Sequence, residues 1–208
     1  QGIVTQDVRT ITPENMIYSC FLTPQGKYLA DFFVTEMAGD WYLDVDGSLL
    51  EDLIKRLTMY RLRSRVTIEN ASVQFKVIAM WGDKAPAGAF ADPRTAQMGW
   101  RALVSPDRQT TFEPGDYTYW RLQNGVPDTG DFIRERSMML ESNMDLLHGV
   151  SFDKGCYMGQ ELTARTHYRA LVKKRLLPLR FARTVQIPFD TPVMMGEQTI
   201  GYVRSQHR

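Results

Sequence analysis

SFDKGCYMGQELTAR (151–165) is the most informative segment of the chain. It places Cys156 between Gly155 and Gly159, and Lys154 stands two positions before the cysteine. Glycine lets backbone or ligand approach a thiol closely. A nearby cation favours the thiolate, which is both the nucleophile and the metal ligand. The alternative is a buried cysteine that only packs, since free cysteine usually behaves as a small hydrophobe. The clustered polar neighbours favour a functional thiol, with Lys154 assisting it.

The block KGCYMGQELTAR resembles the signature of the YgfZ-type folate-binding proteins, which are relatives of the glycine-cleavage aminomethyltransferase. Further blocks that resemble the family follow its order: DPRTAQMGWR (92–101), GVP (125–127), LESN (140–143) and KKRLLPLRF (173–181). The resemblance is greatest to the branch with the mitochondrial iron–sulfur cluster assembly factor. It implies an α+β fold of the aminomethyltransferase-like folate-binding type, with antiparallel sheets and a partial C-terminal β-barrel.

Composition restricts the other function classes. The chain has 208 residues, a net charge of +1 and two cysteines, Cys20 and Cys156. Two distant cysteines are neither a disulfide framework nor a zinc-binding spacing, and they suit a reducing compartment. That compartment is the cytoplasm of a bacterium or the mitochondrial matrix of a eukaryote. The neutral charge and the lack of an apolar run of ~20 residues predict neither a nucleic-acid nor a membrane partner.

Apolar periodicity and turn signals predict the order of the elements. Strands are expected at 16–22, 27–37, 40–45, 66–70, 73–81 and 99–104, and helices at 49–62 and 162–170. Residues 116–124 fit a helix or a strand, and the resemblance favours a helix, because the aminomethyltransferases have one in this place. We expect the tail of a helix at 1–10, a strand at 171–181 and short barrel strands within 185–203. Three units follow: 1–88, ending in a linker at 82–88, then 89–170, then 171–208 as the start of a barrel. We expect family pieces to be missing at both ends.

The resemblance implies candidate folate-binding residues. The catalytic acid of the family's enzymes aligns with Ala30, and Asp31 follows it on the same strand. The family's enzymes have an Arg-x-Glu pair whose carboxylate accepts hydrogen bonds from the pterin ring. Arg121 matches the arginine of this pair, but Gln123 stands at the position of the glutamate. Glu141 is a second acid for the same cavity, and a helix N-terminal acid is the equal alternative. An alanine cannot move a proton, and an amide lacks the charge-assisted fit of a carboxylate. Both changes argue against aminomethyl transfer.

Four further candidates follow the cysteine. Tyr157 stacks on a flat ring or belongs to the core. Gln160, Glu161 and Arg165 line the same site, or Glu161 and Arg165 pair with each other across one helical turn. The basic run 165–180 attracts an acidic partner, a folate tail or RNA, or is simply a solvated face.

The leading hypothesis is an iron–sulfur cluster assembly or maintenance factor, with a folate-type cavity beside Cys156. The cysteine would act with partner proteins and would ligate a cluster only transiently, because clusters normally take four ligands. No other metal ligand is predicted. The implied partners are iron–sulfur assembly proteins and a folate-like small molecule, tetrahydrofolate. The alternatives are a tetrahydrofolate-dependent aminomethyltransferase-like enzyme and, third, an RNA-binding protein linked to tRNA modification.

Overall fold

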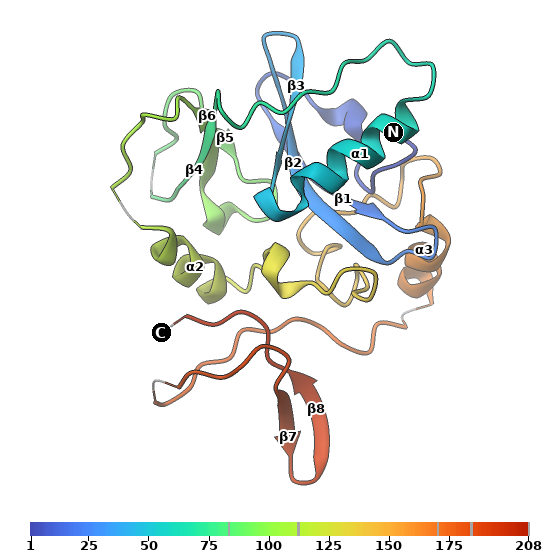
Figure 1. Cartoon of the computed structure of the whole chain (residues 1–208). Helices are drawn as coiled ribbons and strands as arrows, with labels where there is room; N and C mark the ends of the chain where they lie inside the picture. Colours follow the sequence, from blue (N-terminus) through green and yellow to red (C-terminus); the bar gives the residue numbers. More distant parts are fainter. Residues whose placement is uncertain (83, 112, 170, 184, 208) are drawn as a thin grey trace.

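An antiparallel meander forms the centre of the molecule (Figure 1). The computed structural model describes residues 1–82, 84–111, 113–169, 171–183 and 185–207. β1 (Met16–Leu22), β2 (Tyr28–Met37) and β3 (Asp40–Val45) pair in chain order. Every residue of β1 is buried, as are the first eight of β2, so this sheet supplies most of the core. The three predicted strands are confirmed to within one residue.

Helix α1 (Leu50–Arg61) follows the meander and lies across it (Figure 1). A 3₁₀ turn, η2 (Gly47–Leu49), leads into it, and the Asp46 side chain accepts a hydrogen bond from the backbone N–H of Ser48. That contact satisfies one of the unpaired donors at a helix start. Leu53 joins the core of the sheet, which explains why the predicted helical periodicity is confirmed.

A second antiparallel sheet contains β4 (Lys76–Met80), β5 (Phe90–Ala91) and β6 (Trp100–Val104), with β6 in the middle. The predicted strand at 66–70 is wrong, because that segment pairs with no strand and is mostly exposed. α2 (Pro114–Gln123) confirms the predicted helix, and a reciprocal capping box between Glu113 and Asp116 starts it.

The remaining elements are short. They are the 3₁₀ turns η1 (Val8–Thr10), η3 (Ala96–Met98) and η4 (Thr129–Asp131), helix α3 (Gln160–Tyr168) and a hairpin of β7 (Pro192–Met195) and β8 (Gln198–Tyr202). Residues 1–10 are turns and η1 rather than the tail of an α-helix, so that prediction is wrong. The helix predicted at 162–170 is confirmed through Tyr168. Its last residue, Ala170, and Asp83 in the predicted linker lie outside the described residues.

The predicted strand at 171–181 is also wrong. Its backbone bonds to a loop instead of a strand: the Leu176 N–H donates to the Glu141 carbonyl at 3.2 Å, and the Asn143 amide donates to the Leu176 carbonyl at 2.7 Å. The β7–β8 hairpin projects from the body beside this segment (Figure 1). In the described part of the chain the sheets are antiparallel and open, and no barrel closes. No described helix is long and apolar enough to cross a membrane.

Candidate functional site

The two cysteines have opposite environments. Cys156 is exposed to solvent on the irregular segment that precedes α3, whereas Cys20 on β1 is fully buried. Burial raises the pKa of the Cys20 thiol well above its usual value. A thiol that is buried and protonated neither binds metal nor reacts readily. Of the two thiols, Cys156 is therefore the accessible one.

Lys154 does not serve Cys156 in the predicted way. Its ammonium group points inward and donates hydrogen bonds to the backbone carbonyls of Gln1, Val4 and Gln6 at 2.7, 2.7 and 2.8 Å. An ammonium has three protons to donate, so none remains for a thiolate. Burial lowers the pKa of Lys154 to about 8. Its role is to hold the cysteine segment against the first residues of the chain.

A close approach of two glycines holds the other end of the cysteine segment. Gly159 has φ +82°, and a Cβ there would lie 2.7 Å from the Thr23 carbonyl oxygen and 2.8 Å from the Gly26 Cα. Gly26, in the β1–β2 turn, has φ +71° and is equally restricted, because a Cβ there would lie 2.9 Å from the Gly159 carbonyl oxygen. The cysteine segment thus packs directly on the hairpin turn, which only glycine allows on both sides.

The residues after the cysteine make contacts within the protein. Tyr157 is buried in the core of the sheet, so its core alternative holds. The Gln160 side chain accepts a hydrogen bond from the Tyr157 backbone N–H at 3.2 Å. Glu161 and Arg165 form an exposed ion pair of 2.7 Å, four positions apart on α3. These contacts fix the segment that presents Cys156 and the start of α3.

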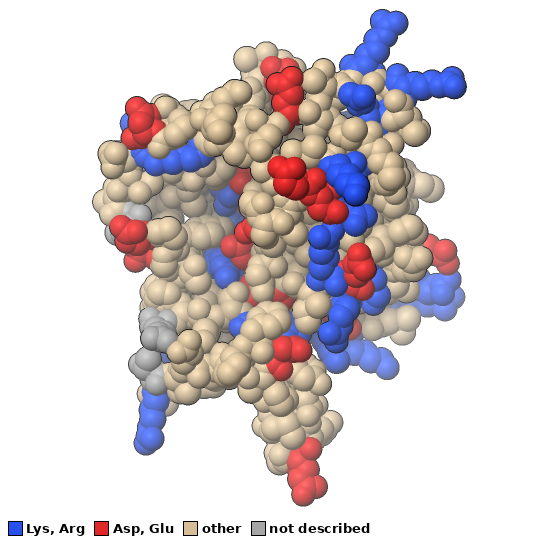
Figure 2. Space-filling view, in the orientation of Figure 1, with Lys and Arg blue, Asp and Glu red and all other residues tan. Residues whose placement is uncertain are grey.

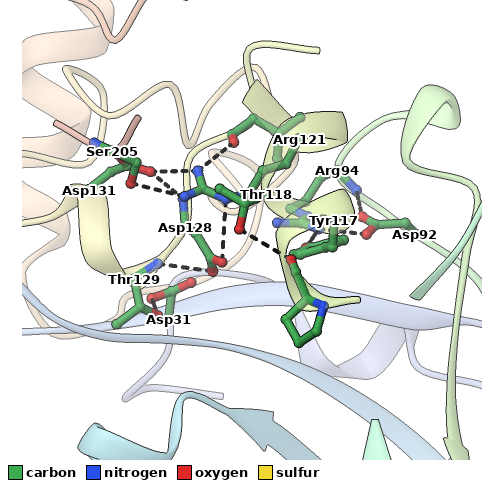
Figure 3. A network of polar contacts seen from close by, with 12 residues as sticks. Asp31, Asp92, Arg94, Tyr117, Thr118, Arg121, Asp128, Thr129, Asp131 and Ser205 are labelled. Carbon is green, nitrogen blue, oxygen red and sulfur yellow. Dashed lines mark hydrogen bonds and ion pairs between the residues drawn. The ribbon is translucent and has the colours of Figure 1, made fainter. Parts of the chain in front are cut away.

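Asp31 belongs to a separate polar network, and Figure 3 shows it beside Thr129. Its carboxylate accepts hydrogen bonds from the Tyr18 hydroxyl at 2.7 Å, the Tyr28 hydroxyl at 2.5 Å and the Thr129 hydroxyl at 2.9 Å. Burial raises the pKa of this carboxyl group, and the two tyrosine hydroxyls oppose that rise. Three of the roughly four acceptor positions of the carboxylate are occupied.

A cavity of about 170 Å³ opens beside this network. Asp31 lines it but Ala30 does not. The strand therefore presents a carboxylate to the cavity although Ala30 occupies the aligned acid position. The other lining residues are Phe32, Phe33, Asp44, Val45, Asp46, Arg101, Tyr117, Asp128 and Thr129. Arg101 is paired with Asp44 and lies 4.0 Å above the Phe33 ring.

The other predicted folate-binding residues lie elsewhere. Arg121 is buried and donates to Asp131 at 2.8 Å and to the Ser205 hydroxyl at 2.9 Å, so it joins α2 to the C-terminal segment (Figure 3). Gln123 is exposed and lines a hollow of about 1,100 Å³ between α2 and residues 175–207. Glu141 lines neither cavity. The predicted set is thus divided among three places.

Cys156 lines neither of the two cavities described above, the cavity at Asp31 and the hollow at Gln123. Helices α2 and α3 lie on opposite sides of the molecule (Figure 1), and Cys156 comes just before α3. The thiol is therefore presented at the surface, on a different side of the molecule from α2.

Sequence reasoning missed the donors around Asp31 and a second buried ion pair. Arg94 and Asp92 pair at 2.7 Å with both side chains almost fully buried, and Arg94 also donates to the Tyr117 hydroxyl (Figure 3). The block DPR (92–94) was the available signal for this pair, since Asp and Arg two apart in a turn can share a bidentate contact. In the described residues, no three His, Cys, Asp or Glu side chains are placed to hold a metal ion.

Known proteins similar to this chain are named as iron–sulfur cluster assembly factors. The IBA57 homolog of Mycosarcoma maydis, named a mitochondrial iron–sulfur cluster assembly factor, is 36% identical over 208 residues, with 87% of this chain and 52% of the relative covered. IBA57 of Mus musculus is 36% identical, covering 78% and 53%. IBA57 of Homo sapiens is 36% identical, covering 90% and 61%. This chain therefore spans a little over half the length of these relatives. No family model matches it.

Proposed function

We propose that this chain acts in the assembly or maintenance of iron–sulfur clusters, with Cys156 as its working thiolate. The main support for this proposal is that Cys156 is exposed on a segment whose backbone is fixed on both sides. Lys154 fixes the segment before the cysteine, and the contact of Gly159 with Gly26 fixes it after the cysteine. A reactive group on a fixed backbone can meet a partner in one geometry. The names of the relatives support the same activity and a mitochondrial location, which we infer to be the matrix.

The proposed chemistry requires partner proteins. An iron–sulfur cluster normally takes four protein ligands. Cys156 supplies one thiolate, and the described residues offer no set of three metal-binding side chains. We infer that other proteins supply the remaining ligands and that the cluster is cargo shared across an interface. An exposed position suits a ligand shared in that way.

The test compares the two cysteines in a cell that lacks its own copy of this protein. Cys156→Ser removes the exposed thiol, and we expect it not to restore the activity of the cell's iron–sulfur enzymes. Cys20→Ala removes the buried thiol and serves as the control, and it should restore that activity at matched protein levels. Full restoration by Cys156→Ser would overturn the proposal.

A folate-type ligand is a second candidate, and one observation favours it: the cavity that Asp31 lines. We infer that a pterin would enter there and not at Gln123. The fit is poor, because 170 Å³ is below the roughly 300–1,000 Å³ of ordinary ligand pockets, and Asp31 has little accepting capacity left. The aminomethyltransferase-like fold itself stays a proposal from resemblance. Calorimetric titration with tetrahydrofolate tests this candidate: saturable heat that Asp31→Asn abolishes would support it, and none would end it.

The two remaining alternatives lose support. Aminomethyl transfer needs a carboxylate free to receive a proton, and Asp31 is enclosed by three hydroxyl groups. RNA binding through 165–180 is weakened because Arg165 is paired with Glu161 and Arg175 with Asp145. Both pairs reduce the positive charge that phosphate groups would meet.

A further inference from the structure

The C-terminal end of α1 is exposed in an unusual way. Met59 is 59% exposed and Leu62 is 84% exposed, although both are large and apolar. A single exposed apolar side chain needs no explanation. Two of them at one helix end, next to a functional thiol, form a feature that typically marks an interaction site.

This end of α1 touches the cysteine segment. The Tyr60 hydroxyl lies 3.4 Å from the Met158 sulfur, two residues beyond Cys156. The Tyr60 ring also packs on Phe21 of β1, at 5.7 Å between centroids. The turn after α1 and the exposed thiol therefore belong to neighbouring parts of the same rigid body.

Leu62 adopts a backbone conformation that suits glycine. Its φ is +49° and its ψ is −115°, close to the first central position of a type II′ turn. A leucine there is strained, because its Cβ meets the following peptide group. Strained residues of this kind cluster at functional sites. The Leu62 side chain is exposed to solvent directly after the helix.

The apolar side chains are surrounded by positive charge. Arg61, Arg63 and Arg65 are all exposed. Across the described ranges, none of the three guanidinium groups pairs with a carboxylate. Figure 2 shows basic side chains projecting at the upper right, over the C-terminal end of α1. A complementary surface would be acidic at its rim and apolar at its centre.

We propose that Met59, Leu62, Arg61, Arg63 and Arg65 form the docking surface for an acidic protein, and that this protein supplies the remaining ligands for a cluster at Cys156. The proposal rests on the proposed function. Protein is favoured over RNA because the two most exposed apolar groups of this surface, Met59 and Leu62, are not aromatic, and single-stranded nucleic acid is bound by aromatic stacking in addition to charge. Apolar anchors with arginines beside them in the chain suit a protein interface.

The experiment places the photo-crosslinker p-benzoylphenylalanine at Met59, in full-length protein in a cell that lacks its own copy. Irradiation should yield one main adduct with an acidic, cysteine-containing protein, identified by mass spectrometry. The same crosslinker at Tyr119, exposed on α2, should not yield it. Reversing the charge of Arg61, Arg63 and Arg65 to Glu should lower the adduct and the activity of iron–sulfur enzymes roughly tenfold.

The matched control reverses three exposed cations on another segment: Lys173, Lys174 and Arg180 to Glu. It makes the same change in net charge and should leave the adduct unchanged. Equal loss in both triple variants, no loss in the Arg61, Arg63 and Arg65 variant, or an adduct with RNA would overturn the inference.

Leu62→Gly separates docking from folding. Glycine relieves the strained φ, so thermal stability should stay level or rise. It also removes the apolar group, so the adduct should fall severalfold. A stabilised variant with undiminished adduct would count against the docking surface. If Cys156→Ser restores enzyme activity while the adduct persists, the proposed function fails and the docking surface stands, so the two failures are distinguishable.

Discussion

The contact between Gly159 and the β1–β2 turn makes a sharp prediction about Gly159→Ala. The new Cβ would lie 2.7 Å from the Thr23 carbonyl oxygen and 2.8 Å from the Gly26 Cα. Both neighbours are backbone atoms and cannot rotate away. A side chain at φ +82° costs ~1–2 kcal/mol, and overpacking of a tight contact adds ~1–3 kcal/mol. The free energy of unfolding should therefore fall by about 2–5 kcal/mol.

Urea denaturation measures this loss. With a slope of about 1–3 kcal/mol per molar urea, the midpoint should fall by roughly 1–2 M. Gly155→Ala is the matched control on the other side of Cys156, because no atom lies within 4 Å of its added Cβ. That control should stay within about 0.5 kcal/mol of the parent. Equal midpoints for the two variants would refute the proposed packing of the cysteine segment on the hairpin.

Three further outcomes follow from buried polar groups. Lys154→Met leaves three carbonyls without their shared donor and should lower the free energy of unfolding by about 3 kcal/mol, whereas Lys173→Met, at an exposed site, should change it by less than about 0.5 kcal/mol in the same urea assay. Tyr28→Phe removes one donor to the buried Asp31 carboxylate and should cost about 2 kcal/mol at pH 7, measured by thermal unfolding. Burial raises the pKa of Asp31, so protonated Asp31 stabilises the fold fully below about pH 4, and this stabilisation is lost as pH rises through the folded-state pKa. Asp31→Asn cannot titrate at this position. The free energy of unfolding of this variant, measured from pH 4 upward, should therefore decline less steeply with pH than that of the parent.

Local patterns predicted the central sheet well. The signals for this sheet are local: strand patterns in 16–22 and 40–45 and the turn TPQG at 23–26. Each can be recognised without knowing what the segment contacts, and the structure has β1, β2 and β3 there. The strand predicted at 171–181 failed because its partner is a loop, at 141–145, and not another strand. Partners far apart in sequence leave no trace in a local pattern.

The sequence identified candidate residues by their type, but it did not predict where their side chains point. Lys154 stands two positions from Cys156, yet its ammonium reaches carbonyls of the first six residues, which sequence proximity cannot reveal. Gln123 appeared to belong with Asp31, but the turn of α2 places it on the exposed side. The exposure of Cys156 depends on Gly159 packing on the hairpin, a tertiary contact that the motif alone does not specify.

The most direct measurement is the alkylation of Cys156 by iodoacetamide in intact cells, quantified by mass spectrometry with and without iron depletion. Buried Cys20 is the internal reference, since it should stay unmodified in both conditions. A cluster ligand is protected from alkylation, so Cys156 should be modified slowly in iron-replete cells and several times faster after depletion. Equal rates of modification in the two conditions would contradict a role for this thiolate in cluster handling.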